Sequence, residues 1–333
     1  MNNQPSLVSN MGGNIGLMMR KYAPLMILIG LVILFSFISP NFMTAFNIRI
    51  LVRQVSFAAI SAVGLMFVMI SGGIDLSIGN QIVMSNVVLA ILLAYRHVPL
   101  SVAIPACLLL GTLLGTINGL LVVKLKIHPL VITLGTSQIY KGIGYIIANS
   151  RNIIGLPDSF RVFGQGYLGP VPIPVVIMIV VALVGSFVLT RTYFGRNVFA
   201  LGGNEEAARL AGLDVNRMKV TLFMLCGFIS GITSVLLLSR VFAGQTSTGQ
   251  GLEFDCLTAA LLGGVSFKGG EGTIFGLITG ILIIGVLNNA MQLASFPDFY
   301  QIVVKGTVLL LAVGFDAYQK SRKAKETVAK VAA

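Results

Sequence analysis

The chain has 333 residues, of which 56% are hydrophobic and only 10% are charged, and its mean hydropathy is +0.92. These values exclude an ordinary water-soluble domain, because the polar residues are too few to cover a folded chain in water. In hydrocarbon the backbone N–H and C=O groups must pair within the protein, so long apolar runs are expected to be helices. The sequence therefore predicts an all-α, polytopic membrane protein.

Ten apolar runs follow a polar N-terminal segment, residues 1–22. Runs of about 17–25 residues are long enough to cross a bilayer as helices. The run at 254–267 is the weakest, because about 14 residues reach only about 21 Å, and we expect a half-span or a broken helix there. Residues 23–318 are thus one transmembrane domain, and residues 319–333 are a basic tail. The predicted spans are residues 23–39, 52–71, 75–95, 99–123, 129–149, 172–190, 218–240, 254–267, 273–291 and 299–316.

The lysines and arginines orient these spans. With ten spans both termini share one side of the membrane, and fifteen of the 23 basic residues fall on that side. Because cytoplasmic segments carry the excess of Lys and Arg, both termini are expected in the cytoplasm. The net charge of +12 then reflects this bias and the basic tail, and it is poor support for nucleic acid binding.

The second and third spans are joined by S-G-G-I-D-L-S-I-G, residues 71–79. The paired glycines Gly72 and Gly73 stop one helix, and Asp75 is expected to cap the next. The simplest interpretation is that Asp75 only satisfies free N–H groups at a helix start. The alternative is that Gly72, Gly73, Asp75 and Ser77 line a translocation path or gate, because acids and broken helices within a membrane tend to mark pathways.

Glycines recur at helical spacing in the fourth, seventh and ninth spans. Such spacing lets helix backbones approach closely, so it predicts helix packing and is only a weak sign of dimerisation. The glycines are Gly111, Gly115, Gly119, Gly227, Gly231, Gly276 and Gly280.

Between residues 191 and 219 the apolar pattern gives way to a polar loop on the predicted cytoplasmic side. Asn204 is expected to cap a short helix, Glu205 and Glu206 suit its positive N-terminus, and Gly212 suits a left-handed C-terminal cap. A helix of about two turns, held between two spans, is suited to transmit the movement of a bound partner to those spans. The alternative is a solvated loop helix without a partner.

The late segment 252–272 has a related pattern, in which Gly263 and Gly264 end a short apolar run. Its likeness to residues 71–79 is either an internal repeat or a chance pairing among 38 glycines. Glu253 and Asp255 are interpreted as interfacial residues at an outer helix start, with docking or path residues as the alternative. Asp255, Gly263 and Gly264 are therefore further candidates for the path or gate.

The sequence gives little support to an enzyme. No phosphate-binding loop of the form G-x-x-x-x-G-K-[ST] is present, so nucleotide hydrolysis is not expected in this chain. His97 and His128 have no partner at metal-ligand spacing, and no Ser, His and acidic constellation stands out. We predict a chain that is not an enzyme and that holds no cofactor or metal of its own.

Three motifs together resemble the permease subunit of ribose- and galactose-type ABC sugar importers. They are residues 71–79, G-G-N-E-E-A-A-R-L-A-G at 202–212, and F-D-C-L-T-A-A-L-L-G-G-V-S-F-K-G-G-E-G at 254–272. The similarity runs from about the first span to Asp316, in the family's order. It implies a monosaccharide permease of the bacterial cytoplasmic (inner) membrane, paired with a second copy. It also implies a cytoplasmic ABC ATPase that binds ATP and magnesium, and an extracytoplasmic sugar-binding protein.

The resemblance gives the polar loop a specific role. It implies that Asn204 to Gly212 form a coupling helix, which rests in a groove of the ATPase and drives alternating access. The implied polar contacts are Glu205, Glu206 and Arg209, and the implied close-packed face consists of Ala207, Ala208 and Leu210.

Arg49, Arg53 and Arg151 on the outer side are candidates for docking the sugar-binding protein. Snorkelling of these side chains toward lipid headgroups is the alternative. Two other function classes stay open. An ion-coupled secondary transporter would need ionisable residues deep inside the spans. A receptor or scaffold subunit would move no solute.

Overall fold

The computed structural model describes residues 7–297, 299–314 and 317, and the described chain is mostly helical. Predictions for residues 1–6 and for the tail at 319–333 lie outside the described residues. The helices are α1 (Leu7–Ile38), α2 (Ala45–Ile70), α3 (Ile78–Ala94), α4 (Leu100–Leu125), α5 (Pro129–Ala148), η1 (Asp158–Arg161), α6 (Val162–Gln165), α7 (Ile173–Arg191), α8 (Tyr193–Gly203), α9 (Glu205–Leu210), α10 (Val215–Val241), α11 (Leu252–Leu262) and α12 (Ile274–Leu293). A further apolar helix spans Phe299–Gly314.

Among the described residues, five helices are long and apolar enough to cross a membrane: α2, α4, α7, α10 and α12. Three shorter apolar helices lie at Ala23–Ile38, Ile78–Ala94 and Phe299–Gly314. The multi-pass helical class is therefore confirmed, whereas ten crossings and the side of the termini stay predictions. The weak run at 254–267 is an 11-residue helix, α11, which is too short to cross alone. The predicted N-terminal segment is helical from Leu7 and continuous with the first apolar run.

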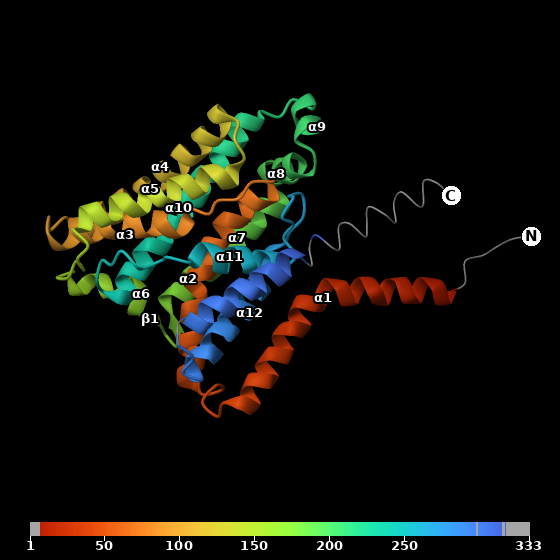
Figure 1. Ribbon diagram of the computed structural model, residues 1–333, viewed down its shortest axis with the longest axis horizontal. Helices are drawn as coiled ribbons and strands as arrows, with labels where there is room; N and C mark the ends of the chain where they lie inside the picture. The colour runs from red at the N-terminus through yellow and green to blue at the C-terminus, as the bar shows by residue number, and fades with distance from the viewer. Residues whose placement is uncertain (1–6, 298, 315–316, 318–333) are drawn as a thin grey trace, which may run out of the picture.

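The helices form two groups that meet along α2 and α10 (Figure 1). One group contains α3, α4, α5 and α10, and the other contains α2, α7, α11 and α12. Most of α2 is sealed from solvent, because its residues from Phe57 to Ile70 pack on neighbours on every side. The first helix, α1, bends and reaches away from the rest, and it contacts α12.

The glycines at helical spacing are where α4 meets α10. A Cβ at Gly111 would lie 3.1 Å from Gly231 Cα, and one at Gly115 would lie 3.0 Å from Gly227 Cα. The prediction of close helix packing is confirmed, and the two stripes are partners of each other within one chain. Gly276 and Gly280 of α12 pack in the same way, against Gly263 and Ala259.

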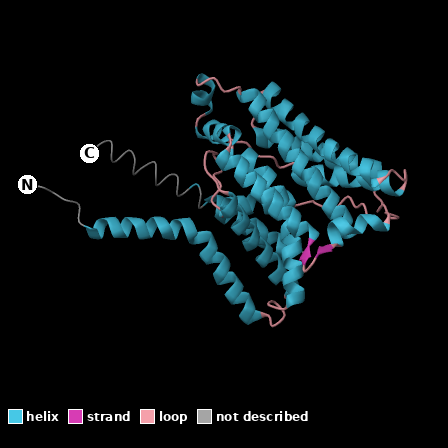
Figure 2. Ribbon diagram, turned by 180° about the vertical axis from the view of Figure 1, so that it is seen from behind, coloured by secondary structure: helices cyan, strands magenta, loops and turns pink. Residues whose placement is uncertain are grey.

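One short hairpin departs from the predicted all-α class. Strands β1 (Tyr167–Leu168) and β2 (Val171–Pro172) are antiparallel, with Tyr167 opposite Pro172 and Leu168 opposite Val171. The hairpin lies at one end of α7, and α8 and α9 lie at the other (Figure 2). The 19 residues of α7 separate these ends by about 28 Å.

Candidate functional site

The predicted short helix in the polar loop is present as α9. Asn204 Oδ1 accepts the backbone N–H of Ala207 at 3.0 Å, so Asn204 is the N-cap. Gly212 has φ +90°, donates to Arg209 O at 3.0 Å, and is followed by Leu213, which donates to Ala208 O at 3.1 Å. These two hydrogen bonds form a complete Schellman motif. Both ends of α9 are thus fixed by local sequence.

A second helix, α8, precedes α9 and was not predicted. Thr192 Oγ1 caps its start by accepting the N–H of Gly195 at 3.2 Å. Since only Asn204 separates α8 from α9, the loop between α7 and α10 consists of two rigid pieces joined at one residue. Asn204 is therefore both the C-cap of α8 and the N-cap of α9.

Glu205 attaches α9 to α10. Its Oε1 accepts from Arg209 Nη2 at 3.0 Å, and its Oε2 accepts from Lys219 Nζ at 2.8 Å. The first bond lies within α9, and the second reaches the first turns of α10. Exposed pairs of this kind contribute at most about 1 kcal/mol each. Their effect is to fix the orientation of α9 relative to α10.

The two faces of α9 differ. Ala208 is buried against its own chain, whereas the side chain of Leu210 is 85% exposed. Glu206, Ala207 and Arg209 are exposed as well. Of the residues implied as a close-packed face, Ala207 and Leu210 point outward, and Ala208 points toward the protein core.

Glycines from all three motifs meet at one place, which we call the glycine junction: Gly72, Gly202, Gly269 and Gly270. Gly270 N donates to the carbonyl oxygen of Ile70, the last residue of α2, at 2.8 Å. A Cβ at Gly202 would overlap that same oxygen, and a Cβ at Gly269 would lie 2.7 Å from Gly72 N. The ends of α2 and α8 and the loop after α11 therefore touch backbone to backbone.

Reasoning from the sequence missed Gly202, Gly269 and Gly270 as contact residues. The signal was present as two further Gly-Gly pairs, at 202–203 and 269–270. Their mutual contact joins segments about 70 and 200 residues apart, and no local rule predicts it. A polar cavity of about 300 Å³ lies beside the junction, lined among others by His128, Lys219 and Lys268.

Asp75 lies ahead of α3 rather than at its cap. The N-cap is Ser77, whose side chain makes no capping bond. Asp75 Oδ1 instead accepts from Ser77 N at 2.9 Å and from Ser77 Oγ at 2.5 Å, and Oδ2 accepts from Gln81 Nε2 at 3.1 Å. The prediction that Asp75 caps the helix is wrong by two residues, because its carboxylate closes the turn before the helix.

The Asp75 cluster connects three helices. Asn118 Nδ2 on α4 donates to Ser77 Oγ at 2.7 Å, and Tyr140 Oη on α5 donates to Asn118 Oδ1 at 2.9 Å. Asp75, Ser77 and Asn118 are fully buried. This arrangement is a closed hydrogen-bonded joint between α3, α4 and α5.

The later candidates lie on α11 and in the turn that ends it. Asp255 on α11 accepts from Lys305 Nζ at 2.9 Å and from Asn288 Nδ2 at 3.5 Å, which connects α11, α12 and the helix Phe299–Gly314. Gly263 packs against Gly276 of α12, and Gly264 takes φ +83° to end α11. The predicted path residues therefore belong to separate contact sets, with Asp75 and Ser77 in the buried cluster, Asp255 paired with Lys305, and Gly263 packed against α12.

The three docking candidates have different surroundings. Arg49 on α2 and Arg151 after α5 are exposed. Arg53 is half-buried, and its Cζ lies 4.8 Å from the ring centre of Tyr167 in the hairpin. Its Nε and Nη2 are buried and have no hydrogen-bond partner among the described residues. Arg49 and Arg151 therefore present their charge at the surface, whereas Arg53 is partly covered.

Comparison with known proteins gives consistent results. The family model described as "Branched-chain amino acid transport system / permease component" matches residues 47–313. The Haemophilus influenzae protein named "Ribose import permease protein RbsC" is 38% identical over 308 residues, covering 91% of this chain and 94% of its own length. The Bacillus subtilis protein of the same name is 38% identical over 300 residues, covering 90% and 93%.

The Escherichia coli K12 protein named "L-arabinose transport system permease protein AraH" is 40% identical over 309 residues, covering 92% and 93%. No solved structure matches the chain significantly. The resemblance carried by the three sequence motifs is thus confirmed by relatives aligned over nearly the whole chain. On the family match and these relatives, the chain is a multi-pass membrane protein that belongs to the permease-component family of ABC import systems.

Proposed function

We propose that the chain is the translocation subunit of an importer that moves a monosaccharide across the bacterial cytoplasmic membrane and is driven by a separate ATPase. Relatives named for ribose import and for L-arabinose transport, 36–40% identical, support a sugar as the solute. Ribose and arabinose are both pentoses, so a pentose is the first candidate. The ATP and magnesium belong to the ATPase.

The observation that carries the proposal is the way α9 is held. It is capped at both ends and is attached to α10 through Glu205 and Lys219. The preceding helix, α8, connects it to the glycine junction at Gly202. Its outer face, with Glu206 and Leu210, is free to contact another protein. A partner that moves α9 therefore moves the end of α2 and the loop after α11.

The transport cycle then follows from two states of the assembly. ATP closes the ATPase pair, the α9 helices of two permease copies follow, and the path between the copies changes its opening, because the partners bind the two conformations with different affinity. In this scheme Gly72, which belongs to the moving junction, and the adjacent Gly73 lie at the cytoplasmic gate. Arg49 and Arg151, at the end of the helices that carries the hairpin, receive the sugar-binding protein.

The proposal is tested by coexpressing the chain with its ATPase and purifying the complex in detergent. We expect Leu210→Glu to abolish retention of the ATPase, because it places a charge at the centre of the contact. Leu168→Glu is the matched control, since Leu168 is 66% exposed and lies in the hairpin at the other end of α7. Equal retention by both variants would contradict the assignment of α9.

A further inference from the structure

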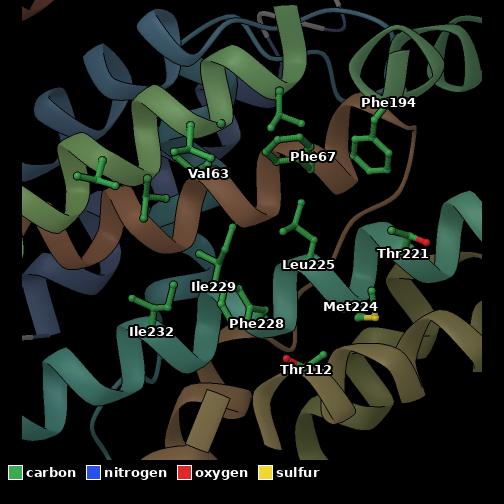
Figure 3. Close-up of a pocket in the computed structure, with 15 residues that line it drawn as sticks. Val63, Phe67, Thr112, Phe194, Thr221, Met224, Leu225, Phe228, Ile229 and Ile232 are labelled. Atoms are coloured by element: carbon green, nitrogen blue, oxygen red, sulfur yellow. The ribbon is translucent and has the colours of Figure 1, made fainter. Parts of the chain in front are cut away.

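A second cavity, of about 530 Å³, lies between α2, α4, α7, α8 and α10 (Figure 3). Val63 and Phe67 of α2 form its inner wall, and Phe194 of α8 lies at one end. The opposite walls come from α7 and from Met224 and Phe228 of α10. The cavity thus lies beside the helix that leads into the α8–α9 segment.

The lining is apolar apart from two threonines, and both threonine hydroxyls are already used. Thr112 Oγ1 donates to Leu108 O at 2.7 Å, and Thr221 Oγ1 donates to Arg217 O at 2.8 Å, each within its own helix. A water or a sugar needs several polar partners in such a space, and the two hydroxyl oxygens offer it only spare acceptor lone pairs and no donor. The cavity therefore suits a hydrocarbon occupant.

The cavity is flanked by a face that hydrocarbon covers. Val180 and Val184 line it and are 53% and 57% exposed, and their neighbour Phe187 on α7 is 62% exposed. Because α7 is long and apolar enough to cross the membrane, its exposed apolar face is expected to meet lipid chains. An empty space opening on that face would forfeit dispersion contacts that a lipid chain supplies.

Two exposed arginines lie close in sequence to the lining residues at the α8 end of the cavity. Arg191 follows the lining residue Val188 by three positions, and Arg196 stacks on Tyr193, next to the lining residue Phe194, at 4.1 Å. Among the described residues neither arginine has an acidic partner, whereas Arg217, one turn before Thr221, is paired with Asp214. Two unpaired cations beside an apolar cleft complement an anionic headgroup.

We propose that this cavity binds an acyl chain of an anionic phospholipid whose headgroup contacts Arg191 and Arg196. The lipid comes from the leaflet on the side of α8 and α9. Its chain fills the space between α7 and α10 and contacts Phe194. The site does not depend on the sugar or on the ATPase.

The chain contains no tryptophan, so one introduced tryptophan reports its surroundings without background. Phe228→Trp places the reporter in the cavity, and Phe187→Trp places a matched reporter on the outer face of α7. Each full-length variant is reconstituted in vesicles in which phosphatidylglycerol or phosphatidylcholine with brominated acyl chains replaces the unbrominated lipid stepwise. For each reporter, quenching by the two lipids is compared at equal mole fraction. The depth of the tryptophan in the bilayer is the same in both measurements, so it does not affect the comparison.

We expect Phe228→Trp to be quenched at a lower mole fraction of the brominated anionic lipid than of the zwitterionic lipid, by about fivefold for each arginine engaged. Adding Arg191→Gln and Arg196→Gln should remove that preference, and Phe187→Trp, one turn from Arg191 on the outer face, should show a weaker preference that the same changes remove. Quenching of Phe187→Trp without quenching of Phe228→Trp would show that lipid does not enter and would overturn the proposal. Equal quenching of Phe228→Trp by both lipids would also overturn it, because the headgroup would then make no contribution. Absence of quenching at both positions would place a second copy of the chain over this face, which overturns it as well.

Discussion

The carbonyl oxygen of Ile70 accepts the backbone N–H of Gly270 at 2.8 Å, although 200 residues separate them in the chain. Ile70 ends α2, whose second half is almost fully buried, and Gly270 lies in the loop after α11. Gly202 of α8 is pressed against the same oxygen. The end of α8 therefore contacts the transmembrane core at the point where two of its parts are hydrogen-bonded together.

Replacing Gly202 with alanine should disrupt this contact. A Cβ there overlaps Ile70 O, so the backbones must separate, at a cost of about 1–3 kcal/mol. The matched control is Gly203→Ala, because a Cβ at Gly203 has nothing within 4 Å. We expect Gly202→Ala to lower ATP-dependent uptake severalfold and Gly203→Ala to leave it nearly unchanged. The amount of folded protein is followed with a thiol-reactive dye, since the three free cysteines are buried. Similar uptake by the two variants would contradict the junction's role.

The ion pair between Glu205 and Lys219 gives a second prediction. Glu205→Lys or Lys219→Glu places like charges about 3 Å apart and should release α9 from α10, at a cost of about 1 kcal/mol or less in stability because the pair is partly exposed. We expect uptake to fall severalfold in each variant. The double variant restores the attraction with reversed charges, so uptake should partly recover. A double variant that behaves as the simple sum of the two singles would show that the pair does not orient α9.

The ion pair between Asp255 and Lys305 gives a third prediction. Their side chains are 15% and 32% exposed, so Asp255→Asn leaves a poorly solvated ammonium group in an apolar region. We expect a loss of about 1–3 kcal/mol, below the cost for a fully buried pair. Asp255→Leu combined with Lys305→Leu should recover most of it. Melting curves read by the cysteine dye measure the stability loss of Asp255→Asn and its recovery in the double variant. A double variant less stable than Asp255→Asn would contradict this explanation.

The buried hydrogen-bonded cluster at Asp75 gives a fourth prediction. Ser77 Oγ donates to Asp75 and accepts from Gln81 and Asn118, so Ser77→Ala removes the centre of a joint between three helices. We expect a stability loss of about 1–3 kcal/mol, because buried polar partners are left unpaired. Uptake per folded molecule should change little if the joint is structural. A large fall in uptake per folded molecule, with stability kept, would instead place Ser77 on the translocation path.

The parts of the site that the sequence predicts are the local ones. Asn204 and Gly212 cap α9 as expected, because capping depends on residues within one or two turns. The α4 glycines were predicted to pack closely, but their partners Gly227 and Gly231 follow only from the folded structure. Asp75 was placed two residues wrong, because Ser77 rather than Asp75 has the N-cap position.

The glycine junction was beyond sequence reasoning. Its contacts join Ile70, Gly202 and Gly270, and the pairing of distant segments is set by tertiary packing alone. The sequence also does not predict that Ala208 is buried against its own chain, because α9 has only six residues and shows no clear apolar face. The sequence pattern does not predict the second helix, α8, because its apolar and polar residues fall within the polar stretch at 191–219.

The most direct test of the central claim is sugar uptake by reconstituted vesicles. The chain together with its ATPase and sugar-binding protein should accumulate ribose or arabinose uphill only when ATP is supplied on the α9 side. The chain alone, with a proton or sodium gradient across the vesicle membrane, should accumulate none. Uphill accumulation by the chain alone would contradict the account, because no second protein would then be needed to move α9.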